Sequence, residues 1–190
     1  MKDWKKSLPM WITMSRILIV PVIVVLMTPN QLTGNVIAAI LFILASITDY
    51  YDGFFARKYN AVSSMGKFMD PIADKILVTS ILVMLVPSDR IEPLMVIIIL
   101  ARDNFIGGLR SVAAADQIII DAKPVGKWKT ALQMVAIPAV IIDQRWLGIP
   151  FEKIGYWVLW ISVILSVTSG VQYYLGYLKA KRLLRGPSKA

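Results

Sequence analysis

Residues 35–56 read NVIAAILFILASITDYYDGFFA, an apolar run that continues without a turn signal into two aspartates, a glycine and an alanine. The apolar part alone is too short to cross a bilayer, because the hydrocarbon core requires about 20 helical residues. A helix that continues to Ala56 is long enough, and it carries Asp49 and Asp52 inside the outer part of a membrane span. Charged residues at such positions indicate a functional site.

The next segment repeats this pattern. Its apolar run, 72–86, is also short, and a helix that begins at Gly66 reaches membrane length only by including Asp70 and Asp74. Pro71 predicts that this helix starts or bends near Asp70, because proline lacks the N–H group that an interior helical position uses. Two consecutive helices are thus expected to bring four carboxylates into the membrane at similar depth.

The composition of the whole chain agrees with a lipid environment. Of its 190 residues, 57% are hydrophobic and 17% are charged, against about 25% charged in ordinary soluble domains. Turn residues separate six apolar segments, and neither a linker nor a repeat divides residues 1–190. The sequence predicts an all-α, polytopic integral membrane protein: six transmembrane helices after a short polar N-terminal segment, in a single domain. The six segments are 11–27, 35–56, 66–86, 93–109, 128–142 and 154–178.

The distribution of basic residues sets the expected orientation. The chain carries 21 Lys and Arg residues, and only Arg90, Arg145 and Lys153 fall on the side opposite both termini. By the positive-inside rule, both termini and the aspartate segment face the cytoplasm. The net charge of +9 is therefore attributed to topology and not to nucleic-acid binding. The start of the chain is too polar for a signal peptide, so no processing is expected.

The absence of two residue types narrows the chemistry. The chain has no cysteine, which excludes disulfides, thiolate nucleophiles and thiolate metal sites, and it has no histidine, the commonest metal ligand and general base. Any metal must be held mostly by oxygen, the preference of Mg²⁺, Mn²⁺ or Ca²⁺. Any general base must be a carboxylate, a lysine or a tyrosine.

Helical geometry places the acidic and small residues on shared faces. At about 100° per residue, Asp52, Gly53 and Ala56 lie within about 60° of Asp49. The same spacing aligns Gly66, Asp70 and Asp74 on the following helix, so the four carboxylates can converge.

Four like charges in a low dielectric repel one another unless cations neutralise them, which predicts two bound divalent metal ions. The small residues leave room for a ligand near the acids, and Arg57 can neutralise a phosphate held there. The alternative is that these acids are solvated or paired with Lys58, Lys67 and Lys75. That alternative does not explain why four acids, two glycines, an alanine and an arginine occur together at these spacings in one helix pair.

The segment Asp49-x-x-Asp52-Gly53-x-x-Ala56-Arg57, followed after eight residues by Gly66-x-x-x-Asp70-x-x-x-Asp74, resembles the signature of the CDP-alcohol phosphatidyltransferases. These membrane enzymes transfer a phosphatidyl or related group from a CDP-linked donor to an alcohol and release CMP. The resemblance implies two Mg²⁺ or Mn²⁺ ions at Asp49, Asp52, Asp70 and Asp74, with Asp74 also the base for the acceptor hydroxyl. It further implies that the CDP group contacts Asp52, Gly53, Ala56, Arg57 and Gly66.

The flanking residues resemble family members that use glycerol 3-phosphate as acceptor and CDP-diacylglycerol as donor. This likeness rests on residues 70–75, residues 126–130, Gln133 and Arg110. It implies that the product is phosphatidylglycerophosphate, that the enzyme lies in the bacterial inner membrane, and that it is a homodimer.

An acceptor that carries its own phosphate needs a second cationic pocket. Four basic residues are candidates for it: Arg102, Arg110, Lys127 and Lys129. The alternative for the two lysines is that they are membrane anchors. Arg102 is followed by Asp103 where the family commonly has glutamate, so this shorter acid is expected to pair differently with the neighbouring basic residues. Arg16, within the first span, is expected to face a polar interior and not lipid.

Two other functions stay open at this point. The same reaction could use another acceptor, such as inositol phosphate or serine. A cation transporter or channel would also place acids inside a membrane. The transporter is disfavoured because the acids cluster towards one face and the opposite half of the spans carries no matching polar ladder.

Overall fold

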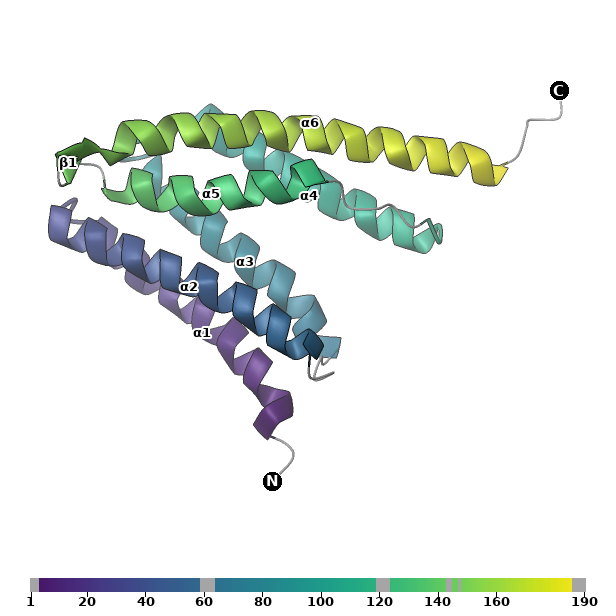
Figure 1. The fold of residues 1–190 in the computed structure, drawn as a ribbon, viewed down its shortest axis with the longest axis horizontal. Helices are drawn as coiled ribbons and strands as arrows, with labels where there is room; N and C mark the ends of the chain where they lie inside the picture. The colour runs from purple at the N-terminus through teal and green to yellow at the C-terminus, as the bar shows by residue number, and fades with distance from the viewer. Residues whose placement is uncertain (1–3, 59–63, 119–123, 143–144, 147, 186–190) are drawn as a thin grey trace. The chain divides into compact units, whose positions relative to one another are not determined.

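The computed structural model describes residues 4–58, 64–118, 124–142, 145–146 and 148–185. Within these ranges the chain forms six α-helices and one short hairpin (Figure 1), which confirms the all-α prediction. The helices are α1 (Trp4–Met27), α2 (Leu32–Lys58), α3 (Ser64–Leu85), α4 (Pro93–Ala115), α5 (Pro124–Ile142) and α6 (Phe151–Arg185). Strands β1 (Arg145–Trp146) and β2 (Ile149–Pro150) pair antiparallel between α5 and α6.

Each predicted segment coincides with one helix, and most helices run further than the apolar pattern. Helix α2 continues through Asp49 and Asp52, as expected from its length. Helix α3 begins at Ser64 and continues through Pro71, so the helix does not start at Asp70. Helix α6 extends beyond its apolar part because the lysines, arginines and alanine that follow favour helix formation, and cations stabilise a helix C-terminus.

Two helical segments are long and apolar enough to cross a membrane among the residues whose side chains are described. They are Val125–Ile142 in α5 and Phe151–Leu183 in α6. Three shorter apolar segments lie at Met14–Met27, Leu32–Thr48 and Lys75–Leu85. Charged residues interrupt the other helices: α4, for example, carries Arg102, Asp103 and Arg110.

The chain packs as two compact units that each combine distant parts of the sequence. The first unit comprises residues 1–91 and 134–156, and the second comprises residues 92–133 and 157–190. The chain therefore passes between the units three times: just before α4, within α5 and within α6. The division of residues 1–190 into one functional domain stays a prediction.

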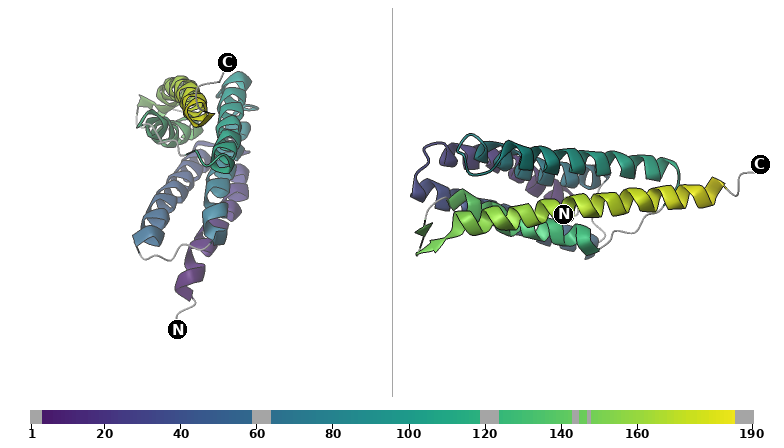
Figure 2. Two further views of the ribbon diagram at one scale, coloured as in Figure 1. Left: turned by 90° about the vertical axis from the view of Figure 1, so that its right-hand side faces the viewer. Right: turned by 90° about the horizontal axis from the view of Figure 1, so that it is seen from above.

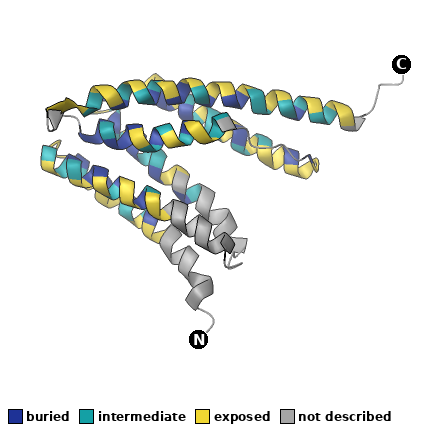
Figure 3. Ribbon diagram, in the orientation of Figure 1, coloured by how far each residue is buried: buried dark blue, intermediate teal, exposed yellow. Residues whose placement is uncertain are grey.

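In the first unit, helix α1 packs against both α2 and α3, and α2 also contacts α3 (Figure 1). The core between them is apolar and includes Ile23, Phe42, Leu77 and Ile81, all fully buried. Buried and exposed positions alternate along these helices, as expected where one face of each is packed (Figure 3). Gly34 lets α2 approach α1 closely, because a Cβ atom there would lie 2.5 Å from the carbonyl oxygen of Leu26.

A buried arginine after α3 links the α1–α2 turn to the end of α5 in the first unit. Helix α3 ends at Leu85, and in the turn that follows Asp89 lies in the left-handed region at φ 55° while the N–H of Arg90 donates to the carbonyl of Leu85 at 3.3 Å. The side chain of Arg90 is only 3% exposed. Its Nη1 donates to the carbonyl of Ile141 at 2.6 Å, and its Nη2 donates to Oδ1 of Asn30 in the α1–α2 turn. Although the sequence places Arg90 in a loop, its charge is buried.

In the second unit, helix α4 ends in a Schellman motif, with Gln117 at φ 55° and the N–H of Ile118 donating to the carbonyl of Ala113 at 2.8 Å. The side chains of Ala113 and Ile118 form a small core with Tyr177 of α6.

The end of α4 is also hydrogen-bonded to α6 by polar side chains. The hydroxyl of Tyr177 donates to Oδ2 of Asp116 at 2.7 Å, and Nζ of Lys181 donates to the same oxygen at 2.9 Å. This cluster of Asp116, Tyr177 and Lys181 is named the α4–α6 clamp. It fixes the axial register of the C-terminal part of α6 against α4.

The hairpin between α5 and α6 was not predicted beyond a turn. Figure 2 shows its strands at the ends of these two helices. Gly148 adopts φ 79°, a conformation that side chains other than glycine rarely adopt, and Trp146 pairs with Ile149. Strands this short leave no periodic signal in the sequence.

Candidate active site

The eight signature residues lie on two consecutive helices of the first unit. The backbone of α2 carries Asp49, Asp52, Gly53, Ala56 and Arg57, and that of α3 carries Gly66, Asp70 and Asp74. The side chains of all eight lie outside the described residues. Their predicted roles as metal ligands, general base and CDP contacts therefore stay predictions.

The chemistry of this donor set suits hard divalent cations. Four carboxylates supply only oxygen, and the chain has no histidine or cysteine to favour a softer metal. The two helices that carry the acids both pack against α1, and α2 contacts α3, so their acidic segments belong to one packed unit. Among the side chains that are described, no cluster of three or more acids forms a second candidate metal site.

Helix α1 contributes a buried cation to the same unit. Arg16 is 3% exposed. A guanidinium this deeply buried requires polar or charged neighbours. Its burial agrees with the expectation that Arg16 faces the interior, whereas the polar character of its surroundings stays a prediction.

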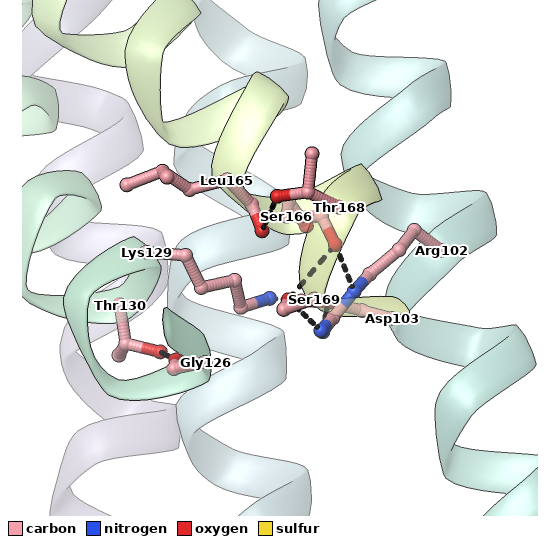
Figure 4. A network of polar contacts seen from close by, with 9 residues as sticks. All are labelled: Arg102, Asp103, Gly126, Lys129, Thr130, Leu165, Ser166, Thr168 and Ser169. Carbon is pink, nitrogen blue, oxygen red and sulfur yellow. Dashed lines mark hydrogen bonds and ion pairs between the residues drawn. The ribbon is translucent and has the colours of Figure 1, made fainter. Parts of the chain in front are cut away.

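A second polar centre lies within the second unit (Figure 4). Nη1 of Arg102 on α4 lies 2.8 Å from Oδ1 of Asp103, and Nζ of Lys129 on α5 contacts the same oxygen. One carboxylate oxygen thus bridges a guanidinium and an ammonium group from two helices. Lys129 is 6% exposed, and the other two side chains are partly buried. Asp103 therefore pairs with both a neighbouring arginine and a lysine of another helix; that it pairs differently from a glutamate at this position stays a prediction.

Helix α6 holds the Arg102 side chain from another direction. Nε of Arg102 donates to the carbonyl of Ser166 at 2.8 Å, and Nη2 donates to Oγ of Ser169 at 2.6 Å. Gly170 makes room for this side chain, because a Cβ atom there would lie 3.3 Å from Cγ and Nε of Arg102. The guanidinium is therefore held by two groups of α6 in addition to Asp103 of its own helix.

The four predicted acceptor-phosphate residues do not share one environment. Lys127 is exposed, whereas Lys129 is buried, because two positions along a helix differ by about 200°. Arg110 is exposed, and its guanidinium lies 5.6 Å from the ring centroid of Tyr173. Arg110 is also eight residues, or about 12 Å, along α4 from Arg102. The structure thus brings Arg102 and Lys129 together around Asp103 and leaves Arg110 and Lys127 apart from this pair.

Two serines of this centre, and a buried glutamine on the same helix as Lys129, were not assigned to it from sequence. Ser166 and Ser169 lie in a run of small residues that predicts close helix packing. The serines in this run were the available signal, because their polar groups can also bind a buried charge. Gln133 lies one turn beyond Lys129 on α5 and is 3% exposed. Its Nε2 atom is buried and has no hydrogen-bond acceptor within the described part of the chain.

Comparison with known proteins identifies the family. The model of the CDP-alcohol phosphatidyltransferase family matches residues 6–168. A CDP-diacylglycerol–glycerol-3-phosphate 3-phosphatidyltransferase of Rickettsia typhi is 39% identical over 170 residues, which cover 89% of this chain and 96% of that protein. The protein of the same name from Bacillus subtilis is 36% identical, over 88% of this chain and 93% of its own. The chain belongs to the CDP-alcohol phosphatidyltransferase family.

Proposed function

We propose that this protein transfers the phosphatidyl group of CDP-diacylglycerol to sn-glycerol 3-phosphate, releasing phosphatidylglycerophosphate and CMP. The main support is that relatives named for this reaction match the chain along nearly their whole length. In the reaction, the acceptor hydroxyl oxygen forms a bond to the phosphatidyl phosphorus. The bond from that phosphorus to the oxygen shared with CMP breaks, and the hydroxyl proton passes to a base.

The first unit supplies residues suited to the donor. Asp49, Asp52, Asp70 and Asp74 would hold two Mg²⁺ or Mn²⁺ ions, which when bound neutralise the pyrophosphate and the charge that develops on CMP. In a chain without histidine, a carboxylate is a suitable proton acceptor, and Asp74 would take the hydroxyl proton.

The small residues near the acids would admit the CDP group. Gly53, Ala56 and Gly66 lack bulk at the positions that a nucleotide must approach, and Arg57 would pair with a phosphate oxygen. Asp52 would contact the same CDP group from the metal side.

The second unit supplies residues suited to the acceptor phosphate. Arg102, which is partly buried, and Lys129, which is buried, offer two cations within reach of one oxygen, an arrangement suited to a phosphate group. The unsatisfied Nε2 donor of Gln133 is a further group able to bind an anion. Arg110 and Lys127, being exposed, would attract the acceptor from solution.

A membrane location follows from the apolar surface. Large apolar side chains on several helices are well exposed, including Leu18 (71%), Trp157 (67%) and Ile164 (60%). Soluble proteins rarely expose large apolar patches, whereas lipid covers exposed apolar side chains on membrane helices. We infer six membrane spans in a bacterial inner membrane, with both termini and the active site facing the cytoplasm, and a homodimer as the functional assembly.

The reaction is tested by measuring CMP release from CDP-diacylglycerol and Mg²⁺ by the detergent-purified protein. Glycerol 3-phosphate, inositol phosphate, serine or no acceptor is added, with EDTA in parallel. We expect release only with glycerol 3-phosphate and none with EDTA. Asp70→Asn should abolish release, whereas Asp89→Asn, an exposed aspartate at the end of α3, should not.

Each outcome discriminates between the candidate functions. Release with another acceptor would change the substrate and keep the reaction. Full activity in EDTA, or in Asp70→Asn, would contradict the metal site. No release with any acceptor, from protein shown to be folded, would contradict the transferase and favour a cation transporter.

A further inference from the structure

The contact made by Asp103 resembles one made by a bound phosphate. A single oxygen, Oδ1, accepts from Nη1 of Arg102 and from Nζ of Lys129, which come from different helices. A phosphate oxygen bound between a guanidinium and an ammonium group would occupy the same position. In this structure the position is filled by a side chain of the protein itself.

Groups other than Asp103 also hold the Arg102 guanidinium. Nε and Nη2 of Arg102 are bound by the Ser166 carbonyl and the Ser169 hydroxyl of α6, at 2.8 and 2.6 Å. Removing the Asp103 carboxylate would leave both of these hydrogen bonds in place. The contribution of Asp103 to this centre is therefore mainly its negative charge.

That charge opposes the binding of a second anion. The side chains of Arg102, Asp103 and Lys129 carry a net charge of +1 together, whereas glycerol 3-phosphate carries close to two negative charges near neutral pH. A buried pair of cations without a counterion would be unstable, so a resident carboxylate is useful when the substrate is absent. The Asp103 carboxylate must then move, or be displaced, before a phosphate oxygen can take the position of Oδ1 between the two cations.

We infer that Asp103 is a resident counterion that competes with the acceptor phosphate for Arg102 and Lys129, and so sets the affinity for glycerol 3-phosphate. This inference rests on the proposed function. It makes Asp103 a specificity-determining residue that acts against binding, and not a ligand of the substrate. The carboxylate protects the pocket when it is empty and weakens binding when the substrate arrives.

The test measures KM for glycerol 3-phosphate and for CDP-diacylglycerol separately in Asp103→Asn. We expect KM for glycerol 3-phosphate to fall by about tenfold, because a neutral amide competes poorly for two cations, while KM for the lipid donor stays unchanged. Inhibition by inorganic phosphate should strengthen by a similar factor. Asp116→Asn is the matched control. Asp116 lies at the C-terminal end of α4 and, like Asp103, pairs with a lysine, so its replacement should change neither KM value.

Conservative variants separate competition from a positioning role. Asp103→Glu keeps the charge and should have nearly wild-type KM values. If Asp103 instead positions Lys129, Asp103→Asn raises KM for glycerol 3-phosphate, and this result or an unchanged KM overturns the inference. Should Asp103→Asn fail to fold in size-exclusion chromatography, Asp103→Ser provides the same neutral substitution with a smaller side chain.

A further variant tests whether glycerol 3-phosphate binds at Arg102 and Lys129 at all, separately from the role of Asp103. Lys129→Gln should raise KM for glycerol 3-phosphate in wild-type background. An unchanged KM there would show that the acceptor binds elsewhere, and the inference would fall with the pocket. The proposed reaction is tested separately by CMP release and would not be contradicted by that result.

Discussion

Replacing Arg90 by alanine tests whether the buried guanidinium holds the first unit together. The variant removes the donor to the Ile141 carbonyl, at 2.6 Å, and the donor to Oδ1 of Asn30. Oδ1 of Asn30 keeps the amide of Asn35 at 3.3 Å, whereas the Ile141 carbonyl, at the end of α5, loses the partner that the structure gives it.

The expected loss follows from these contacts. A hydrogen bond to a charged group contributes about 1.5–3 kcal/mol, and a buried acceptor left without a partner costs about 1–3 kcal/mol. The guanidinium no longer has to be buried, which offsets part of this loss. We therefore expect Arg90→Ala to lower the free energy of unfolding by about 3 kcal/mol.

Unfolding is followed by tryptophan fluorescence during a reversible SDS titration in mixed micelles. Lys153→Ala is the control, because Lys153 belongs to the same unit and is exposed, and its loss should change stability by less than about 0.5 kcal/mol. Arg90→Lys keeps the charge without the planar fork that serves two acceptors, so its stability should be intermediate. Equal stability of Arg90→Ala and the control would refute the reasoning.

Two further substitutions probe the packing within each unit. Gly34→Ala should destabilise the first unit by about 1–3 kcal/mol in the same titration, since its Cβ would lie 2.5 Å from the backbone oxygen of Leu26. Gly108→Ala is the control and should be neutral or slightly stabilising, because nothing lies within 4 Å of the added atom; a similar loss in both would contradict the clash. Tyr177→Phe should cost about 1 kcal/mol by removing the 2.7 Å hydrogen bond to Asp116, without changing KM for glycerol 3-phosphate; a changed KM would show that the α4–α6 clamp serves the acceptor pocket.

The helices could be predicted because their signals are local. Apolar runs bounded by turn residues located all six, and the length that a span requires carried α2 past Asp49 and Asp52. Helix ends were less predictable, since α1 and α6 continue into polar residues that also favour helices. The hairpin has two residues per strand, too few for any periodicity.

The polar contacts depended on distant parts of the chain. Arg90 was counted as a loop charge, and nothing near it in sequence indicates that Asn30 and Ile141 lie close to it. Arg102 is similarly bound by serines more than sixty residues away. The sequence shows which residues are charged, whereas only the fold determines which of these charges are paired.

Helix α6 has 35 residues and is therefore about 52 Å long, whereas α4 has 23 residues and is about 34 Å long. The hydrocarbon core of a bilayer is about 30 Å thick, so α4 fits it and α6 exceeds it. The α4–α6 clamp holds Tyr177 level with the end of α4, so under the proposed membrane topology the last turns of α6 would extend beyond the lipid tails. In that topology the hydrogen-bonded register would set the hydrophobic thickness of the α4–α6 pair, and a bilayer of different thickness would have to adapt to the protein or tilt both helices together.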